Sequence, residues 1–225
     1  ERLLLEDERR DLGCFQIPNN IYIPISKLEN GDKTSDPFRL GIHYLHQFYS
    51  NKNITILARF KELIEAYNCN DRLKSYLRIW FTSCQSRLHK MNRYTAKHHR
   101  HVGPLANTFY VSSTPTEISP FYFIKSKIAA NKLDIISDKN IVNQVCSATT
   151  SLIKENSIDY IFTDPPFGAN IMYSELNFVW ESWLGLKTNN KTEAISNRTQ
   201  HKSLFDYQEI MTKCFQEYYR ILKPG

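Results

Sequence analysis

Four neighbouring residues combine a carboxylate, a rigid turn and an aromatic ring: Asp164, Pro165, Pro166 and Phe167. They follow residues 158–162, an apolar run that predicts a short buried strand. Proline has no N–H group to donate to a sheet, so the predicted strand must end at this point. The carboxyl edge of an open α/β sheet is where such folds place their ligands. We therefore expect a ligand site at this turn.

These residue types suit a reaction in which an amino group is the nucleophile. The exocyclic amine of a nucleobase is a poor nucleophile because its lone pair is delocalised into the ring. The Asp164 carboxylate can accept one N–H and the Pro165 carbonyl can accept the other, which favours a pyramidal nitrogen aimed at an electrophile. Phe167 can stack on a base that has left the duplex. The turn therefore predicts an amine-orienting catalytic site made of Asp164, Pro165, Pro166 and Phe167.

The run from Thr163 to Gly168 resembles the (D/N/S)PP(Y/F) motif of S-adenosylmethionine-dependent amino-methyltransferases. The wider run of residues 157–185 is similar to DNA methylases of the N6-adenine/N4-cytosine group, especially a bacterial subgroup with a zinc-ribbon insertion. The resemblance extends to residues 38–67, 86–111 and 219–225. It implies methyl transfer from S-adenosylmethionine to the amino group of a flipped base. The Asp at the first motif position favours adenine N6 over cytosine N4.

The resemblance also implies a fold, partners and further site residues. The fold would be α/β: a partial, helix-rich, Rossmann-like methyltransferase domain with an additional helical region that contacts DNA. Tyr173 and Asn177, on a predicted amphipathic helix over residues 173–184, would line the pocket for the target base. Ser147 falls where relatives often carry an acidic residue and would bond the adenine of the cofactor; a simple turn serine is the alternative. A cognate restriction endonuclease is a further implied partner.

A cluster of basic residues follows a predicted long helix that starts at Asp71 and runs to about Arg93. If the helix continues, five cations fall within a sector of about 140° at about 100° per residue. A basic helix face favours contact with DNA phosphates, and a solvated surface is the alternative interpretation. The five candidate DNA-binding residues are Arg87, Lys90, Arg93, Lys97 and Arg100.

The sequence contains no glycine-rich cofactor loop. Its seven glycines include no GxG pair, whereas the usual S-adenosylmethionine loop needs glycines so that the backbone can approach the ligand. The chain lacks an initiating Met and ends in a Lys-Pro-Gly turn, so we expect a fragment of a longer protein that is inactive alone. The five scattered cysteines form no CxxC pair, and no metal site is predicted.

Composition limits the class of protein without deciding it. Of the 225 residues, 41% are hydrophobic, which favours a folded chain. The net charge of +6 favours a polyanionic partner. No signal peptide or long apolar run is present, so we expect a cytoplasmic protein with reduced thiols and no membrane contact. Three regions are expected: an irregular segment over residues 1–37, a helical, basic, nucleic-acid-contacting region over 38–106, and a partial catalytic domain over 107–225.

The sequence also predicts strands, a loop and a helix cap at particular residues. Strands are expected at residues 107–111, 143–145 and 158–162, and a mobile polar loop at residues 187–203. A capping box from Asp206 to Glu209 is expected to begin the last helix. Two other functions stay open: an RNA guanine-N2 methyltransferase, which also uses a Pro-Pro motif, and a non-catalytic DNA-binding subunit with a vestigial motif.

Overall fold

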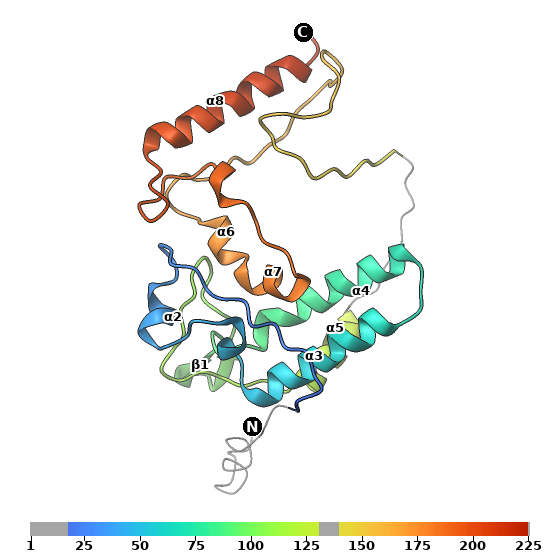
Figure 1. Ribbon diagram of the computed structural model, residues 1–225, viewed down its shortest axis with the longest axis vertical. Coiled ribbons are helices and arrows are strands. Elements are labelled where there is room, and N and C mark those ends of the chain that lie inside the picture. Colours follow the sequence, from blue (N-terminus) through green and yellow to red (C-terminus); the bar gives the residue numbers. More distant parts are fainter. Residues whose placement is uncertain (1–17, 131–139, 225) are drawn as a thin grey trace, which may run out of the picture. The chain divides into compact units, whose positions relative to one another are not determined.

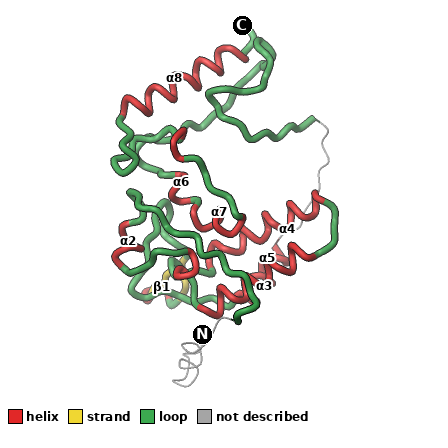
Figure 2. The backbone as a smooth tube through the Cα atoms, viewed as in Figure 1, coloured by secondary structure: helices red, strands yellow, loops and turns green. Residues whose placement is uncertain are grey.

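The computed structural model describes residues 18–130 and 140–224, and most of its regular elements are helices (Figures 1 and 2). The chain divides into two compact units. The first unit comprises residues 1–132 and 175–188, and the second comprises residues 133–174 and 189–225. The part of the predicted irregular segment before residue 18 lies outside the described residues. The predicted division into three functional regions stays a prediction.

The first unit consists of helices around one apolar core. Its two long helices, α3 and α4, lie side by side, and each begins at a polar cap. Ser50 Oγ accepts from Asn53 N at 3.2 Å at the start of α3, and Asn70 Oδ1 accepts from Leu73 N at 2.9 Å at the start of α4. The helical elements of this unit are α2 (Ser35–Arg39), η1 (Leu45–Phe48), α3 (Asn51–Ala66), α4 (Asp71–Cys84), η2 (Gln85–Arg87), η3 (Ala96–His98), α5 (Pro120–Ala130) and α7 (Phe178–Leu184).

Aromatic side chains fill the centre of this core. Trp183 is 1% exposed, and its ring packs edge-on against Tyr49 and Phe81 at centroid distances of 6.0 and 5.4 Å. Trp183 Nε1 donates to Tyr49 Oη at 3.1 Å, and Tyr49 Oη donates to Gln85 Oε1 at 3.0 Å. Edge-to-face rings with satisfied polar atoms hold residues 175–188 to the helices of the first unit. Trp180 of the same helix, in contrast, is 38% exposed.

A two-stranded antiparallel hairpin is the one sheet among the described residues. β1 (Arg93–Thr95) pairs with β2 (Arg100–Val102), and η3 lies between them. His99 ends η3 in the left-handed region, at φ 48°, which turns the chain into β2. The predicted helix to Arg93 was therefore wrong beyond Cys84, where α4 ends. The run of Tyr, Thr and Val around the loop has strand propensity, and pairing across the loop satisfies its backbone.

The predicted parallel sheet is not present in the described part of the chain. Residues 107–111 and 143–145 form no strand. Ile158 forms a single parallel bridge with Leu222: Ile158 N donates to Ile221 O, and Lys223 N donates to Ile158 O, each at 3.0 Å. A strand needs hydrogen-bonded neighbours, so an apolar run without them stays extended but unpaired. The observed architecture is mixed, with helices and one small sheet, and no Rossmann fold is shown.

The second unit consists of one long helix and extended segments. Helix α8 (Leu204–Ile221) buries Met211, Cys214 and Ile221. Its capping box joins Ser203 to Asp206 rather than Asp206 to Glu209. Ser203 Oγ accepts from Asp206 N at 3.3 Å, and Asp206 Oδ2 accepts from Ser203 N at 2.7 Å. The short helix α6 (Tyr173–Leu176) and η4 (Asn190–Thr192) complete the regular elements of the described residues.

The polar segment before α8 contains buried residues. Ile195 is 0% exposed and Asn197 is 2% exposed. Lys202 Nζ donates to the carbonyls of Asn190 and Glu193 at 2.6 and 2.7 Å. The segment that composition predicted as a mobile loop is therefore held by specific contacts. No helix among the described residues is both long and apolar enough to cross a bilayer.

Candidate functional site

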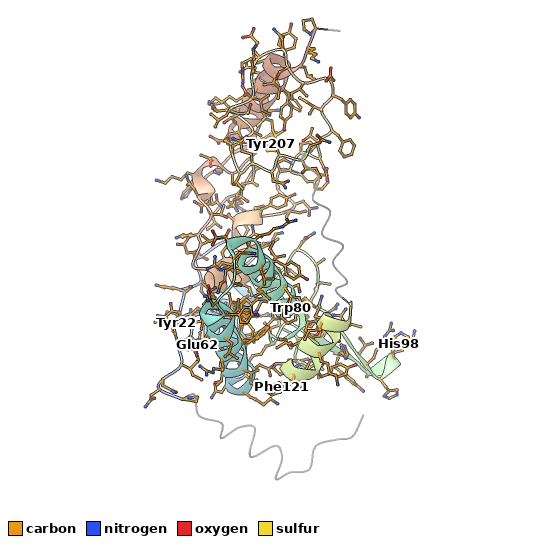
Figure 3. All side chains as sticks on the ribbon, turned by 90° about the vertical axis from the view of Figure 1, so that its right-hand side faces the viewer. Tyr22, Glu62, Trp80, His98, Phe121 and Tyr207 are labelled. Carbon is orange, nitrogen blue, oxygen red and sulfur yellow. The ribbon has the colours of Figure 1, made fainter. Side chains whose placement is uncertain are left out.

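The turn at Asp164–Phe167 lies in the second unit and is held through its backbone. Tyr207 Oη, on the first turn of α8, donates to Pro166 O at 2.8 Å (Tyr207 is labelled in Figure 3). Asn170 N donates to Phe167 O at 3.4 Å. Gly168 has φ 63°, which favours a residue without Cβ, and its carbonyl accepts from Ser196 N at 3.4 Å. The turn is thus fixed on its carboxyl-terminal side.

The two predicted amine acceptors, at the amino-terminal end of the turn, have no partner among the described residues. Asp164 and Pro165 are exposed, and neither the Asp164 carboxylate nor the Pro165 carbonyl accepts a hydrogen bond from any described residue. Phe167 is 61% exposed, which leaves much of its ring open to solvent. The structure therefore presents two free acceptors and an aromatic ring within four consecutive residues. A planar group with two N–H donors fits this combination of groups.

Helix α8 also fixes the segment that precedes the turn. Ser151 N and Ser151 Oγ donate to Glu217 Oε1 at 2.8 and 2.6 Å. Arg220 donates to both carboxylate oxygens of Glu217, at 2.8 and 2.7 Å, and to Ile153 O at 2.9 Å. These bonds from Arg220, followed by those from Ser151, lower the pKa of Glu217 to about 2. Glu217 therefore stays ionised and holds residues 151–153 on α8 at neutral pH.

A weaker contact joins the residue after the predicted strand to the same helix. Thr163 Oγ1 lies 3.5 Å from Tyr218 Oη. Tyr160 and Phe162 are 76% and 86% exposed, so the apolar character that predicted a buried strand is not matched by burial. The segment is exposed because the described residues provide no second layer for it to pack against.

The other predicted ligand residues are not gathered around the turn by any described contact. Tyr173 begins α6 and is 41% exposed. Asn177 belongs to the first unit and is exposed. Ser147 lies in an exposed turn in which its Oγ is 2.8 Å from Thr149 Oγ1 and accepts from Thr149 N at 3.2 Å. The Ser147 hydroxyl is thus engaged in a local serine turn, which favours the alternative interpretation of a simple turn serine.

The five predicted DNA-binding cations do not share a helix face, because the helix ends before them. Arg87 ends η2 and is exposed. Lys90 Nζ donates to Gln47 O at 3.0 Å, and Arg93 Nε donates to Gly103 O at 3.2 Å. Both are therefore engaged in holding the chain. Lys97 and Arg100 belong to the hairpin and are exposed, and neither side chain forms an ion pair or hydrogen bond with a described residue.

Sequence reasoning missed the residues that hold the turn. Tyr207 and Ser196 lie 41 and about 30 residues from the carbonyls that they bind, and no local pattern marks a partner at that separation. The cap at Ser203 had a visible signal, since Ser203 and Asp206 have the spacing of a capping box. No group of three or more His, Cys, Asp or Glu among the described residues is placed to hold a metal ion.

Comparison with known proteins identifies no relative: no family model, no curated protein and no solved structure matches this chain.

Proposed function

We propose that this chain carries the amine-orienting site of an S-adenosylmethionine-dependent DNA amino-methyltransferase that acts on adenine N6. One observation carries the proposal: the Asp164 carboxylate and the Pro165 carbonyl are both free and exposed, beside the exposed ring of Phe167. The next carbonyl, that of Pro166, is occupied by Tyr207. The turn is therefore held from the Pro166 carbonyl onward, while the two acceptors before it stay available to a ligand.

In this proposal the chain's own residues orient the nucleophile. The two N–H bonds of the amine point at Asp164 and at the Pro165 carbonyl, which turns the nitrogen lone pair away from the ring and toward the methyl donor. Phe167 stacks on the base and fixes its plane. The site acts by orienting the amine and by stabilising the positive charge that develops on its nitrogen, and the methylated nitrogen then loses its extra proton to solvent.

The methyl donor enters only through the resemblance of the sequence to amino-methyltransferases. The Ser147 hydroxyl is engaged in a local turn, and the sequence has no GxG pair that would let the backbone approach a cofactor. We derive no step through S-adenosylmethionine in this chain. The basic balance of +6 supports a polyanionic partner, and a cytoplasmic location and a cognate restriction endonuclease belong to the same proposal.

The decisive experiment replaces the carboxylate in the full-length gene product. Asp164→Ala should lower the turnover number for methyl transfer to duplex DNA by about 100-fold to 1000-fold, because one preformed polar contact in the transition state is worth about that much. The affinity for DNA should change little, since Asp164 does not bind the phosphate backbone. Radiolabelled methyl transfer measures the first quantity and fluorescence anisotropy the second.

A matched control lies five residues earlier in the same segment. Asp159 is also an exposed aspartate, but it forms an ion pair with Lys223 at 2.5 Å. Asp159→Ala should leave methyl transfer close to the wild-type rate. Near-wild-type turnover in Asp164→Ala would overturn the proposed role of the turn. Methylation of guanine in RNA, with none in DNA, would favour the RNA methyltransferase instead.

A further inference from the structure

The hairpin Arg93–Val102 is a short ribbon with a fixed base and an exposed end. Its base is tied to a neighbouring segment by Tyr94 N, which donates to Thr114 O at 3.4 Å, and by Thr116 N, which donates to Asn92 O at 2.9 Å. Figure 3 shows His98 at the end of the hairpin farthest from the helices of the first unit. The four residues between the strands, from Ala96 to His99, are all exposed.

The charge around this ribbon has one sign. Between Asp71 and Glu117 the sequence contains eight Lys or Arg residues and no Asp or Glu, although the whole chain has 23 acidic residues. Within the hairpin, Arg93 is engaged by Gly103 O, while Lys97 and Arg100 are free of any described partner. Because this stretch carries positive charges and no carboxylate, it attracts a polyanion, and a nucleic acid fits it better than an acidic or neutral protein surface does.

The register places the free groups where a groove can receive them. Arg100 pairs with Thr95 and Arg93 with Val102, so these four side chains share one face of the ribbon. Tyr94 and His101 share the other face. Lys97, His98 and His99 lie at the tip and offer donors and acceptors beyond the last strand pair.

We propose that this hairpin enters the major groove of DNA, with Lys97 and Arg100 contacting base edges and phosphates. The inference rests on the proposed function, because it takes DNA as the partner. The major groove of B-form DNA is about 12 Å wide and admits a two-stranded ribbon. A-form RNA has a deep and narrow major groove that side chains cannot read, so the ribbon favours DNA over double-stranded RNA.

The first arm of the test compares two double variants of the whole chain. Lys97→Ala with Arg100→Ala removes two free cations from the hairpin. Arg72→Ala with Lys125→Ala removes two exposed cations from helices of the same unit. Binding to a DNA duplex is measured by fluorescence anisotropy at several salt concentrations. The hairpin variant should bind at least about ten-fold more weakly and lose about two units of salt slope, and the control should change by less than about two-fold.

The second arm asks which part of DNA the hairpin contacts. A duplex built with 7-deazapurines lacks the N7 acceptors of the major groove and keeps its phosphates. Wild-type binding should weaken on this duplex, and the difference between wild type and the Lys97/Arg100 variant should shrink. An equal loss on both duplexes would mean phosphate contact alone and would overturn entry into the groove.

The outcomes separate this inference from the proposed chemistry. Equal affinities of the hairpin and control variants, or no DNA binding by the wild-type chain, would overturn the role of the hairpin and leave the Asp164 experiment unaffected. Stronger binding to an RNA duplex than to DNA would also overturn it. The circular dichroism of both variants should match that of the wild type, because the four replaced side chains are exposed. The more conservative pair Lys97→Gln and Arg100→Gln should reproduce the loss if the alanine pair fails to fold.

Discussion

The two units of this chain differ in how much of their apolar surface they bury. The first unit encloses a continuous core in which Phe48, Phe81, Phe109 and Trp183 are each less than 2% exposed. The second unit buries fewer side chains, among them Met211 and Ile221 on one face of α8, and leaves Tyr219 84% exposed. Its stability relies on polar contacts, such as those of Glu217. Burial stabilises the first unit, and hydrogen bonds to one helix hold the second.

The two units therefore differ in how open a turn can be to solvent or to a ligand. A turn within the first core would have its carbonyls and side chains enclosed by neighbours. In the second unit the turn at Asp164 is held through the carbonyls of Pro166, Phe167 and Gly168, and its other polar groups have no partner among the described residues. Three measurements test this difference between the two units.

The largest effect should come from removing the central tryptophan of the first unit. Trp183→Ala should lower the free energy of unfolding of that unit by about 3–5 kcal/mol, because it leaves a cavity and removes the donor to Tyr49. Trp180→Ala, three residues earlier on α7 and 38% exposed, is the control and should cost about 1 kcal/mol or less. Urea unfolding followed by circular dichroism tests both. Equal losses would contradict the description of a tightly packed core around Trp183.

Acid should weaken the first unit next most strongly, through His89. This side chain is 4% exposed, and burial lowers its pKa to about 4 from an ordinary value of 6.5. The folded state keeps the imidazole neutral, while the unfolded chain takes up a proton below pH 6.5. The contribution of the neutral His89 to the free energy of unfolding is therefore complete above pH 6.5. It falls as the pH drops toward 4, by about 3 kcal/mol in total. Below pH 4 this contribution changes no further.

All three tryptophans, Trp80, Trp180 and Trp183, lie in the first unit, so urea unfolding followed by their fluorescence reports that unit alone. The unfolding free energy should be lower at pH 4.5 than at pH 7. His89→Phe keeps an aromatic ring near Tyr49 and should remove most of that difference. A wild-type chain with the same stability at both pH values would contradict the buried neutral histidine.

The smallest effect should be the acid response of the second unit. The pKa of Glu217 is lowered to about 2 from 4.5, so its contribution is complete above pH 4.5 and is lost as the pH falls toward 2. Carbon-13 NMR of the side-chain carboxyl group should show Glu217 titrating well below the usual glutamate range. Glu217→Gln should speed hydrogen exchange at Ser151 N at neutral pH, since the charged acceptor is lost. A Glu217 titration near pH 4.5 would mean that the Ser151–Arg220 contacts do not persist in solution.

The sequence predicted local features better than long-range ones. Helix α8, the helical break at Gly185 and the turn after residue 162 all follow from side-chain periodicity or from the backbone limits of Gly and Pro. The hairpin at Arg93 was missed because its basic residues also fit a helical spacing, and only pairing between its two strands decides against the helix.

The parallel sheet failed as a prediction for a related reason. An apolar, β-prone run specifies a strand only where other strands accept its hydrogen bonds, and Ile158 finds a single bridge partner among the described residues. The candidate turn was identified from its residue types alone. Its supporting residues, Tyr207 and Ser196, depend on how the chain returns to the turn, which no local pattern encodes.

The bond from Tyr207 to Pro166 has a consequence for how long the turn keeps one shape. Tyr207 lies in the first turn of α8, and terminal helical turns open and close far faster than helix interiors. The Ser203–Asp206 capping box slows that fraying. The arrangement at Asp164 and Pro165 thus depends in part on a helix end about forty residues away in sequence, and a more stable first turn of α8 should keep the turn in one shape for longer.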